Sequence, residues 1–266
     1  MTSPSHDSAA PTTADRAATL TRLHRAPELL QVVNVWDVVS TRAVADLPGT
    51  RAIATAGHSI AATFGYEDGT IPFDLTLDLL RRITAATELP VSADLDDGYE
   101  QPGETVRRAI DAGVVGANVE DRLRPVGEAT ARVEAIVAAA AAEGVEFALN
   151  ARTDAFVRAG DRPVAESVAD AVERGRAYLE AGATTVFVPG GFGEDVIAEL
   201  VAGIGHNRVS LIALGDVPAP ARLAELGVAR LSYGPLTQRV ALGALVDMAE
   251  RVYGGDVPPS GIRPLN

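Results

Sequence analysis

Residues 114–151 read VVGANVEDRLRPVGEATARVEAIVAAAAAEGVEFALNA. The six residues at each end are almost all apolar or small, a pattern typical of strands that are covered on both faces. The middle, GEATARVEAIVAAAAAEG, has a helical pattern and ends on Gly144, where glycine can adopt the left-handed conformation that ends a helix. The segment is therefore predicted to form a strand, a helix and a second strand.

The same alternation extends in both directions and gives eight units. The other predicted strands are LQVVNV from Leu30, RAIATA from Arg51, LPVSAD from Leu89, TTVFVP from Thr184, RVSLIA from Arg208 and VARLSY from Val228. The other clear helical patterns are FDLTLDLLRRITAATE, GETVRRAIDAG and VAESVADAVERGRAYLEAG, the last two ending on Gly113 and Gly182. Eight such units predict an α/β fold, the (β/α)8 TIM barrel. The alternative is an open doubly wound sheet, but the turn after the first strand, WDVVSTRAV, lacks the glycine pattern G-x-G-x-x-G.

The domain organisation is predicted to be simple. Residues 1–15, MTSPSHDSAAPTTAD, lack the basic and apolar regions of a signal peptide and are expected to form a disordered tail. Residues 16–266 contain no linker and are expected to form a single barrel domain. No apolar run approaches the roughly 18 residues that span a bilayer, so a cytoplasmic location is expected.

Composition excludes several classes of function. The 266 residues carry a formal net charge of −13, which argues against nucleic acid or an anionic membrane as a partner. The chain has no cysteine, which excludes thiolate nucleophiles, and all 23 basic residues are arginine, which excludes Schiff-base chemistry on lysine. A small-molecule ligand is the expected partner.

Polar residues follow most of the predicted strands, at the barrel end where TIM-barrel enzymes have their active sites. They are Trp36 and Asp37, Gly57, His58 and Ser59, Asp94, Asp96 and Asp97, Asn118, Glu120 and Asp121, Asn150, Arg152 and Asp154, and Ser232, Tyr233 and Gly234. So many acidic strand ends around one arginine predict a functional site.

Asp94 and Asp96 are the strongest metal candidates. Alternate residues of a strand share a face, so both carboxylates are predicted to point into the barrel mouth, with Glu120 on the next strand. Crowded carboxylates raise one another's pKa unless a cation is present, and Mg²⁺ prefers oxygen ligands and keeps several waters. Asp97, directly before Gly98, fits the ordinary role of a turn former.

Three further residues carry open alternatives. Arg152 could grip a substrate carboxylate, or it could only neutralise Glu120 or Asp154, and the two roles are compatible. His58 is either an acid/base catalyst or a residue that merely lines its loop. Trp36 is expected to form a wall of the pocket.

The motifs NVWDVVSTRAV, TAGHSIAATFGYEDG, SADLDDGY, GANVEDR and LNARTDAF together resemble the isocitrate lyase/phosphoenolpyruvate mutase superfamily, from about Gln31 to Gly234. The resemblance implies a (β/α)8 barrel, a last helix exchanged between subunits of a homodimer or homotetramer, and Mg²⁺, or Mn²⁺ in its place, as cofactor. It also implies cleavage or formation of C–C or P–C bonds through an enolate of a 2-oxo acid.

The resemblance also assigns roles by position. Asp94 matches the direct metal ligand, and Asp96 and Glu120 match the residues that hold metal-bound waters. Asp68 matches a further acidic catalytic residue, and Arg152 matches the arginine that holds the substrate carboxylate. Gly57 and His58 occupy a turn whose backbone N–H groups hold the substrate oxyanion. The strand-end residues Trp36, Asp37, Asn118 and Ser232 complete the predicted substrate-binding set.

The chain departs from the family at the lid. Family lyases carry a Lys-Cys-Gly-His type motif after the fourth strand, whereas here only DRLRPVG follows Glu120 before the next helix. We therefore expect a Mg²⁺-dependent lyase that cleaves or decarboxylates a small 2-oxo or 2-hydroxy (di)carboxylic acid, in which His58 or an ordered water moves the proton in place of the lost lid group. The alternatives are a P–C bond mutase or phosphonopyruvate hydrolase, and a non-catalytic 2-oxo-acid binding protein.

Overall fold

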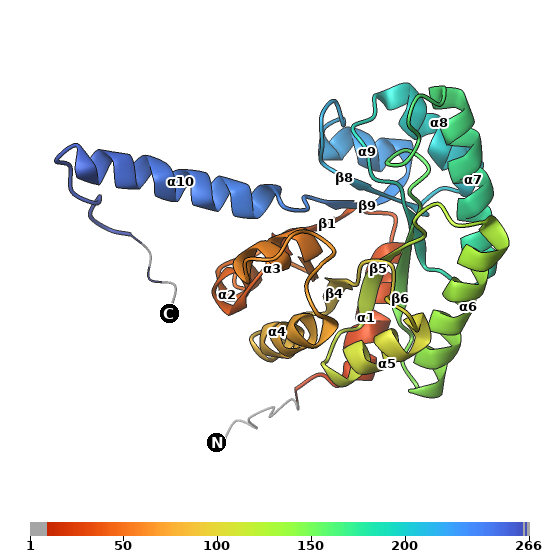
Figure 1. The fold of residues 1–266 in the computed structure, drawn as a ribbon, viewed down its shortest axis with the longest axis horizontal. Coiled ribbons are helices and arrows are strands. Elements are labelled where there is room, and N and C mark those ends of the chain that lie inside the picture. The colour runs from red at the N-terminus through yellow and green to blue at the C-terminus, as the bar shows by residue number, and fades with distance from the viewer. Residues whose placement is uncertain (1–9, 263, 265–266) are drawn as a thin grey trace, which may run out of the picture.

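The computed structural model describes residues 10–262 and 264, and shows parallel strands arranged around an axis with helices outside them (Figure 1). The strands are β1 (Leu30–Val32), β2 (Asn34–Val35), β3 (Ile53–Thr55), β4 (Val91–Asp94), β5 (Gly116–Glu120), β6 (Ala148–Arg152), β7 (Thr185–Phe187), β8 (Val209–Ile212) and β9 (Val228–Ser232). Each of the eight predicted strands is present, and the predicted TIM barrel is confirmed.

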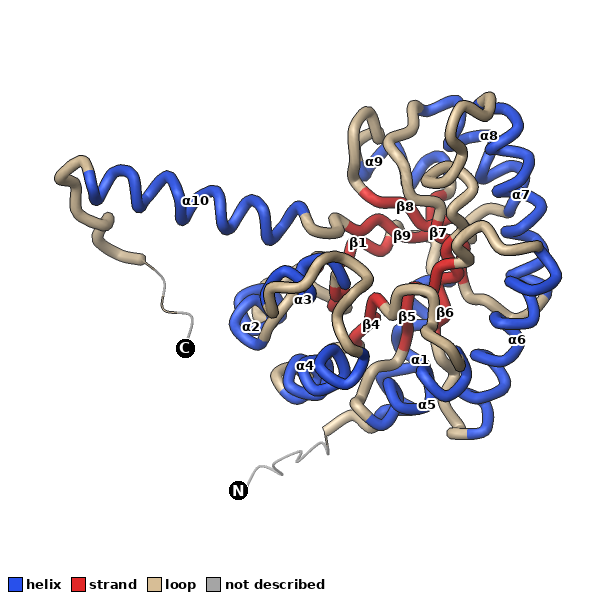
Figure 2. Tube along the Cα trace, in the orientation of Figure 1, coloured by secondary structure: helices blue, strands red, loops and turns tan. Residues whose placement is uncertain are grey.

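The first predicted strand is divided into β1 and β2 on either side of Val33. Strand β1 pairs with β9 and β2 pairs with β3, so the two halves of one strand complete the ring from opposite sides. The remaining strands pair in chain order, each parallel to its neighbour (Figure 2). This closure brings the carboxyl ends of all strands to one mouth.

Ten helices accompany the strands in the described part of the chain. They are α1 (Thr13–Arg25), α2 (Val38–Ala45), α3 (Gly57–Thr63), α4 (Phe73–Ala85), α5 (Pro102–Asp111), α6 (Val126–Ala142), α7 (Val164–Glu180), α8 (Glu194–Ile204), α9 (Pro220–Leu226) and α10 (Leu236–Tyr253). The three predicted helix-ending glycines Gly113, Gly144 and Gly182 have φ of 86°, 68° and 101°. Each donates its N–H to a carbonyl of the last turn, so glycine is required where these helices end.

The expected tail overlaps the first helix. Helix α1 begins at Thr13, because Thr12 and Asp15 form a capping box in which each side chain accepts the other's backbone N–H. Residues 13–15 are therefore helical, and residues 1–9 lie outside the described part.

Parallel pairing aligns polar residues at the mouth. Asp94 at the end of β4 is paired with Asn118 of β5, and Glu120 at the end of β5 is paired with Arg152 of β6. Two residues deeper than Asp94, Ser92 accepts a hydrogen bond from the buried Arg230, whose Nη1 lies 3.0 Å from its Oγ. Complete burial lowers the pKa of Arg230 to about 10.

Helix α10 projects away from the barrel (Figure 1). Gln238, near its start, is its only buried residue and donates to the Ser59 carbonyl at 3.0 Å. Several large apolar side chains of the helix are exposed, including Val240, Leu245 and Val246.

Across the described residues, none of the helices combines the length and the apolar character that crossing a membrane requires.

Candidate active site

A pocket of about 700 Å³ lies at the barrel mouth and collects most of the predicted site residues. Those that line it are His58, Asp68, Asp94, Asp96, Asn118, Glu120, Arg152 and Ser232. They come from five different strands (β3, β4, β5, β6 and β9) or the segments that follow them, so only closure of the barrel brings them together.

Three other predicted residues do not line this pocket. Asp37 is the N-cap of α2, where its Oδ1 accepts the Ser40 N–H at 2.7 Å. Trp36 packs against the hydrophobic core as a partly buried residue. Gly57 does not line the pocket and instead bonds Asp94 through its backbone N–H. The pocket wall predicted for Trp36 and the ligand contact predicted for Asp37 gain no support from this geometry.

Gly57 is required by its close approach to the acidic cluster. Its N–H donates to Asp94 Oδ2 at 3.0 Å. A Cβ on Gly57 would lie 3.2 Å from Asp94 Oδ2 and 3.3 Å from Asp96 Oδ1, which is tighter than ordinary contact. Because this N–H already donates to a carboxylate, the backbone N–H of His58 is the one of the two predicted donors that has no acceptor among the described residues.

The acidic cluster of Asp94, Asp96 and Glu120 has raised pKa values throughout. Burial raises the pKa of Asp94, although the Gly57 N–H favours its ionised form. Burial, followed by the Asp94 charge, raises the pKa of Asp96 to about 7. Burial also raises the pKa of Glu120, while Arg152 works in the opposite direction. The arrangement therefore favours a proton or a cation at this position.

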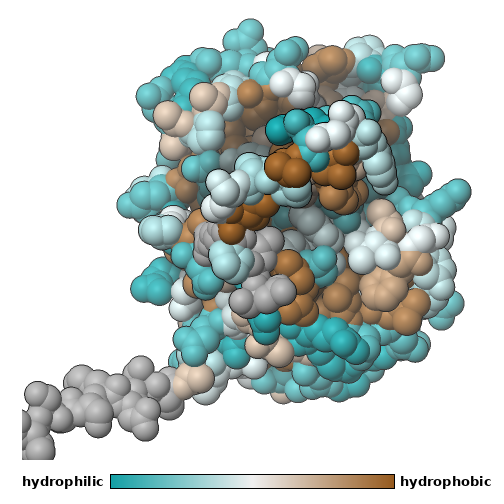
Figure 3. All heavy atoms as spheres, turned by 90° about the vertical axis from the view of Figure 1, so that its left-hand side faces the viewer, coloured by the Kyte–Doolittle hydropathy of each residue, from teal (hydrophilic) through white to brown (hydrophobic). Residues whose placement is uncertain are grey.

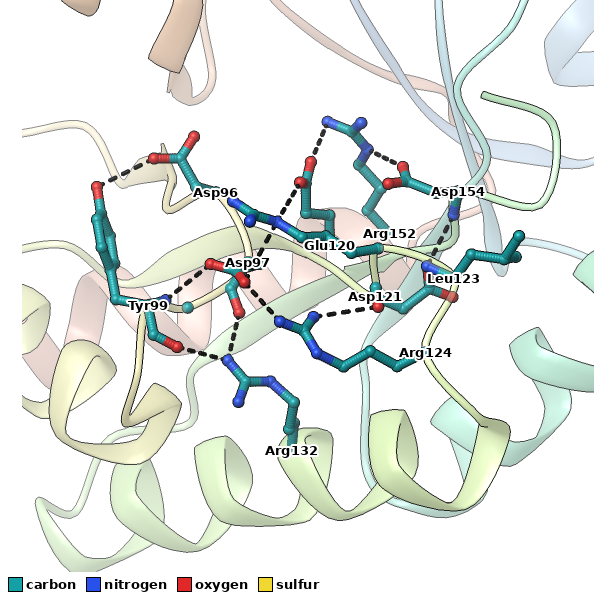
Figure 4. A network of polar contacts seen from close by, with 12 residues as sticks. Asp96, Asp97, Tyr99, Glu120, Asp121, Leu123, Arg124, Arg132, Arg152 and Asp154 are labelled. Atoms are coloured by element: carbon teal, nitrogen blue, oxygen red, sulfur yellow. Dashed lines mark hydrogen bonds and ion pairs between the residues drawn. The ribbon is translucent and has the colours of Figure 1, made fainter. Parts of the chain in front are cut away.

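Arg152 is held between two carboxylates (Figure 4). Its Nη1 lies 2.8 Å from Glu120 Oε2 and its Nε lies 2.8 Å from Asp154 Oδ1. Burial opposes the charged form of Arg152, but Glu120 and Asp154 outweigh burial and raise its pKa. The salt-bridge role left open by the sequence is therefore present. In the described part of the chain, Nη2 of Arg152 has no protein acceptor, so one edge of the guanidinium remains for a ligand.

His58 and Asp68 both line the pocket and their side chains lie close together. His58 Nδ1 lies 3.7 Å from Asp68 Oδ2, and their side chains are 43% and 60% exposed. Asp68 lies in a loop between Gly65 and Gly69, which both have positive φ and whose Cβ positions are open. The imidazole is thus accessible from solvent and beside the acidic cluster.

Sequence reasoning named Asn118 and Asn150 at strand ends but missed the hydrogen-bond network that joins them, of which Asn118 lines the pocket. Asn150 Nδ2 donates to Asn118 Oδ1 at 2.7 Å and to Ser210 Oγ at 3.1 Å, and Asn150 Oδ1 accepts from Thr185 Oγ1 at 2.8 Å. The only sequence signal was the inward phase of these strand residues. The network fixes the amide of Asn118, a predicted ligand contact.

Sequence reasoning also gave no role to Arg122 and Arg158, which line the pocket. Arg122 Nε lies 3.2 Å from both Asp97 Oδ2 and Glu120 Oε1. Asp97 accepts the Tyr99 N–H, as expected of a turn former. It also forms an ion pair with Arg124 at 2.7 Å, which the sequence did not predict.

The donor set fits a hard divalent cation that keeps most of its waters. Among the described residues, no group of three or more His, Asp or Glu side chains is arranged to hold a metal ion directly. The three candidate donors are carboxylates, and Asp94 is half-buried with no guanidinium of the described residues within 4.0 Å of it. Asp94 as the direct ligand, with Asp96 and Glu120 binding ligand waters, fits both facts.

Asp96 predicts a pH dependence of the metal-free protein's stability. Its pKa is raised from 3.8 to about 7, so between these values the folded state holds a proton that the unfolded chain has lost. This contribution to stability is full below pH 3.8 and is lost as the pH rises through 7. With a chelator present, the wild-type free energy of unfolding should fall by about 1–2 kcal/mol more than that of Asp96→Asn between pH 5 and pH 8.

The Asp96→Asn substitution changes the titrating group and little else. Asparagine tolerates the positive φ of 49° at this position and can still accept from the Tyr99 hydroxyl, which donates to Asp96 at 3.0 Å. Equal pH dependence of the two proteins in urea titrations would contradict the raised pKa of Asp96.

Comparison with known proteins gives consistent results. The family model described as phosphoenolpyruvate phosphomutase matches residues 20–253. An oxaloacetate decarboxylase of Bradyrhizobium sp. is 29% identical over 85% of this chain and 81% of its own. A Corynebacterium glutamicum protein named as a probable 2-methylisocitrate lyase is 26% identical over 83% of this chain and 71% of its own. A Burkholderia cenocepacia J2315 structure, described provisionally as a phosphonomutase, superposes with a TM-score of 0.84 at 38% identity, over 90% of this chain and 99% of that one.

Proposed function

Because the chain belongs to the isocitrate lyase/phosphoenolpyruvate mutase superfamily, we propose that it is a Mg²⁺-dependent lyase that cleaves a C–C bond of, or decarboxylates, a small 2-oxo or 2-hydroxy (di)carboxylic acid. The observation that carries the proposal is the convergence of the acidic cluster and Arg152 in one pocket at the barrel mouth. Carboxylates suited to a divalent cation and a guanidinium suited to a carboxylate are the two requirements for binding a 2-oxo acid.

Each side chain has a defined task in this proposal. The free edge of Arg152 binds the substrate carboxylate, and its two ion pairs prevent the guanidinium from rotating. The amide of Asn118 and the hydroxyl of Ser232, both lining the pocket, orient the substrate's polar atoms. Asp94, Asp96 and Glu120 hold the cation, which when bound supplies Lewis-acid stabilisation of negative charge on the substrate.

The reaction requires one proton movement that a side chain can serve. When a bond to C3 of a 2-oxo acid breaks, its electron pair moves into the 2-oxo group and negative charge develops on that oxygen. The backbone N–H of His58 donates a hydrogen bond to this oxygen, and C3 then takes a proton. The imidazole of His58, beside Asp68, delivers that proton in place of the lid groups that this chain lacks.

A substrate panel tests the proposal. Purified protein with Mg²⁺ should consume oxaloacetate or a related 2-oxo or 2-hydroxy diacid, measured by release of CO₂ or of a 2-oxo acid. Consumption should stop on addition of a chelator. Binding of these acids without turnover of any would contradict catalysis and favour a non-catalytic 2-oxo-acid binding protein.

A second candidate function is cleavage or rearrangement of a P–C bond. It is supported by the family model and by the Burkholderia structure, which is 38% identical to this chain. Consumption of phosphonopyruvate, but of none of the carboxylic acids, would favour this second function.

We also propose that α10 is exchanged between subunits. Its exposed apolar side chains occupy more than one face, and most of the stability of a helix in a protein comes from packing of its apolar face. Figure 3, viewed from the side to which α10 projects, shows apolar residues gathered on this face of the molecule. A second copy of the chain would cover them, with each buried side chain contributing about 1–2 kcal/mol.

Sedimentation should therefore show a dimer or tetramer at micromolar concentration. The double substitution Leu242→Glu and Val246→Glu places charges on one face of α10 and should produce a monomer. Glu250→Gln on the same helix is the control and should leave the assembly intact. A monomeric wild-type protein at this concentration would rule the exchange out.

A further inference from the structure

Asp154 holds two arginines of the pocket at once. It is almost completely buried, and its Oδ1 accepts from Arg152 Nε at 2.8 Å while its Oδ2 accepts from Arg158 Nε at 3.1 Å. The chain achieves this locally, because the Arg158 N–H bonds the Asp154 carbonyl at 2.9 Å. This single helical turn places residues four apart on the same side.

The two guanidinium groups are therefore neighbours. Each Nε is one hydrogen bond from the same carboxylate, so the two atoms lie within about 8 Å of each other. The end carbons of an extended four- or five-carbon chain are about 4–5 Å apart, which leaves room for a hydrogen bond at each end.

Arg158 has the least compensated charge of the three arginines that line the pocket. Arg152 is paired with two carboxylates, and Arg122 contacts two more. In the described chain the only acidic partner of Arg158 is Asp154, which it shares, and its two terminal nitrogens have no protein acceptor. Its side chain is 50% exposed at the pocket edge, where a ligand can reach it.

We propose that Arg158 binds the second carboxylate of a dicarboxylate substrate and thereby selects diacids over monoacids. This inference rests on the proposed function, in which Arg152 binds the carboxylate beside the 2-oxo group. A diacid would otherwise bring a second negative charge into a pocket lined by five carboxylates and three arginines. A planar guanidinium held at Nε presents its two terminal nitrogens as a fork for that carboxylate.

Calorimetry in the presence of Mg²⁺ with two probes tests the assignment. Oxalate has two carbons and is long enough only for the positions of the first carboxylate and the 2-oxo group, whereas 3,3-difluorooxaloacetate also carries the distal carboxylate. Arg158→Gln should raise the Kd of 3,3-difluorooxaloacetate by about tenfold or more and change the Kd of oxalate less than about twofold. Arg158→Lys should recover part of the loss. Arg162→Gln is the matched control, because Arg162 pairs with Asp170 and does not line the pocket.

The outcomes distinguish failure of the role assigned to Arg158 from failure of the proposed function. If the wild type binds oxalate but Arg158→Gln weakens both probes equally, or neither, the role of Arg158 is wrong and the proposed function stands. If the wild type binds neither probe, the proposed function fails, and the assignment of Arg158 fails with it.

Discussion

Asp94→Asn is expected to lower the affinity for Mg²⁺ by more than about 100-fold and kcat by roughly 10³-fold. Residues that only hold a metal's ligands in place typically account for roughly 10–100-fold in metal affinity, so loss of a direct ligand should cost more. Loss of the cation also removes roughly 4 kcal/mol of charge stabilisation from the reaction, which lowers kcat. The fold should persist, because asparagine can still accept the Gly57 N–H that donates to Asp94. The substitution also removes a half-buried carboxylate whose ionised form is disfavoured, because burial raises its pKa.

Calorimetric titration with Mg²⁺ measures the affinity, and thermal unfolding in chelator checks the fold. Asp78→Asn is a suitable control, because that carboxylate is exposed on α4 and pairs with Arg82 on the surface. An unchanged Mg²⁺ affinity of Asp94→Asn would refute the assignment of Asp94 as the metal ligand.

His58→Ala is expected to lower kcat by about 100-fold or more, with a smaller effect on KM. Positioned acid/base side chains contribute roughly 10²–10⁴-fold, and the backbone N–H at residue 58 survives the substitution. The change therefore isolates the imidazole from the oxyanion contact. One limb of the pH–rate profile should flatten at the same time.

Asp68→Asn provides the companion measurement. Asp68 Oδ2 lies 3.7 Å from His58 Nδ1 and Asp68 has no other basic partner in the described structure, so we expect it to act on the reaction through the imidazole. We expect a smaller loss than for His58→Ala, and no additional loss when both are substituted. A normal kcat and an unaltered pH profile for His58→Ala would show that the side chain only lines the loop, and would leave an ordered water as the proton donor.

Much of the fold was predictable because its signals are local. Apolar runs such as LPVSAD mark strands that are buried on both faces, and glycines such as Gly144 mark the ends of helices. Once eight such units are present, the topology of the barrel places every strand end at one mouth. The position of Asp94, Glu120 and Arg152 in one pocket followed from this rule.

Other features depended on contacts that no local pattern encodes. The motif WDVV does not reveal whether Asp37 caps a helix or lines the pocket, because aspartates at strand ends do both. The structure shows that Asp37 caps α2 by accepting the Ser40 N–H. Gly57 has a backbone contact with Asp94, 37 residues later, which only the pairing of β3 with β4 produces. The split of the first strand at Val33 likewise reflects closure of the ring.

The sequence by itself therefore determined the barrel, the end of the barrel at which the pocket lies and the many carboxylates that line this pocket. Its apolar periods and the residues at their ends are properties of neighbouring positions. Only the tertiary structure decided which charges meet. Arg152 is shared between Glu120 and Asp154, and Asp154 in turn holds Arg158, because strand register and one helical turn set the distances between these atoms. The terminal nitrogens of Arg158 have no acceptor among the residues that the structure describes. Electrostatic interactions depend on such distances and on burial, which are properties of the folded chain.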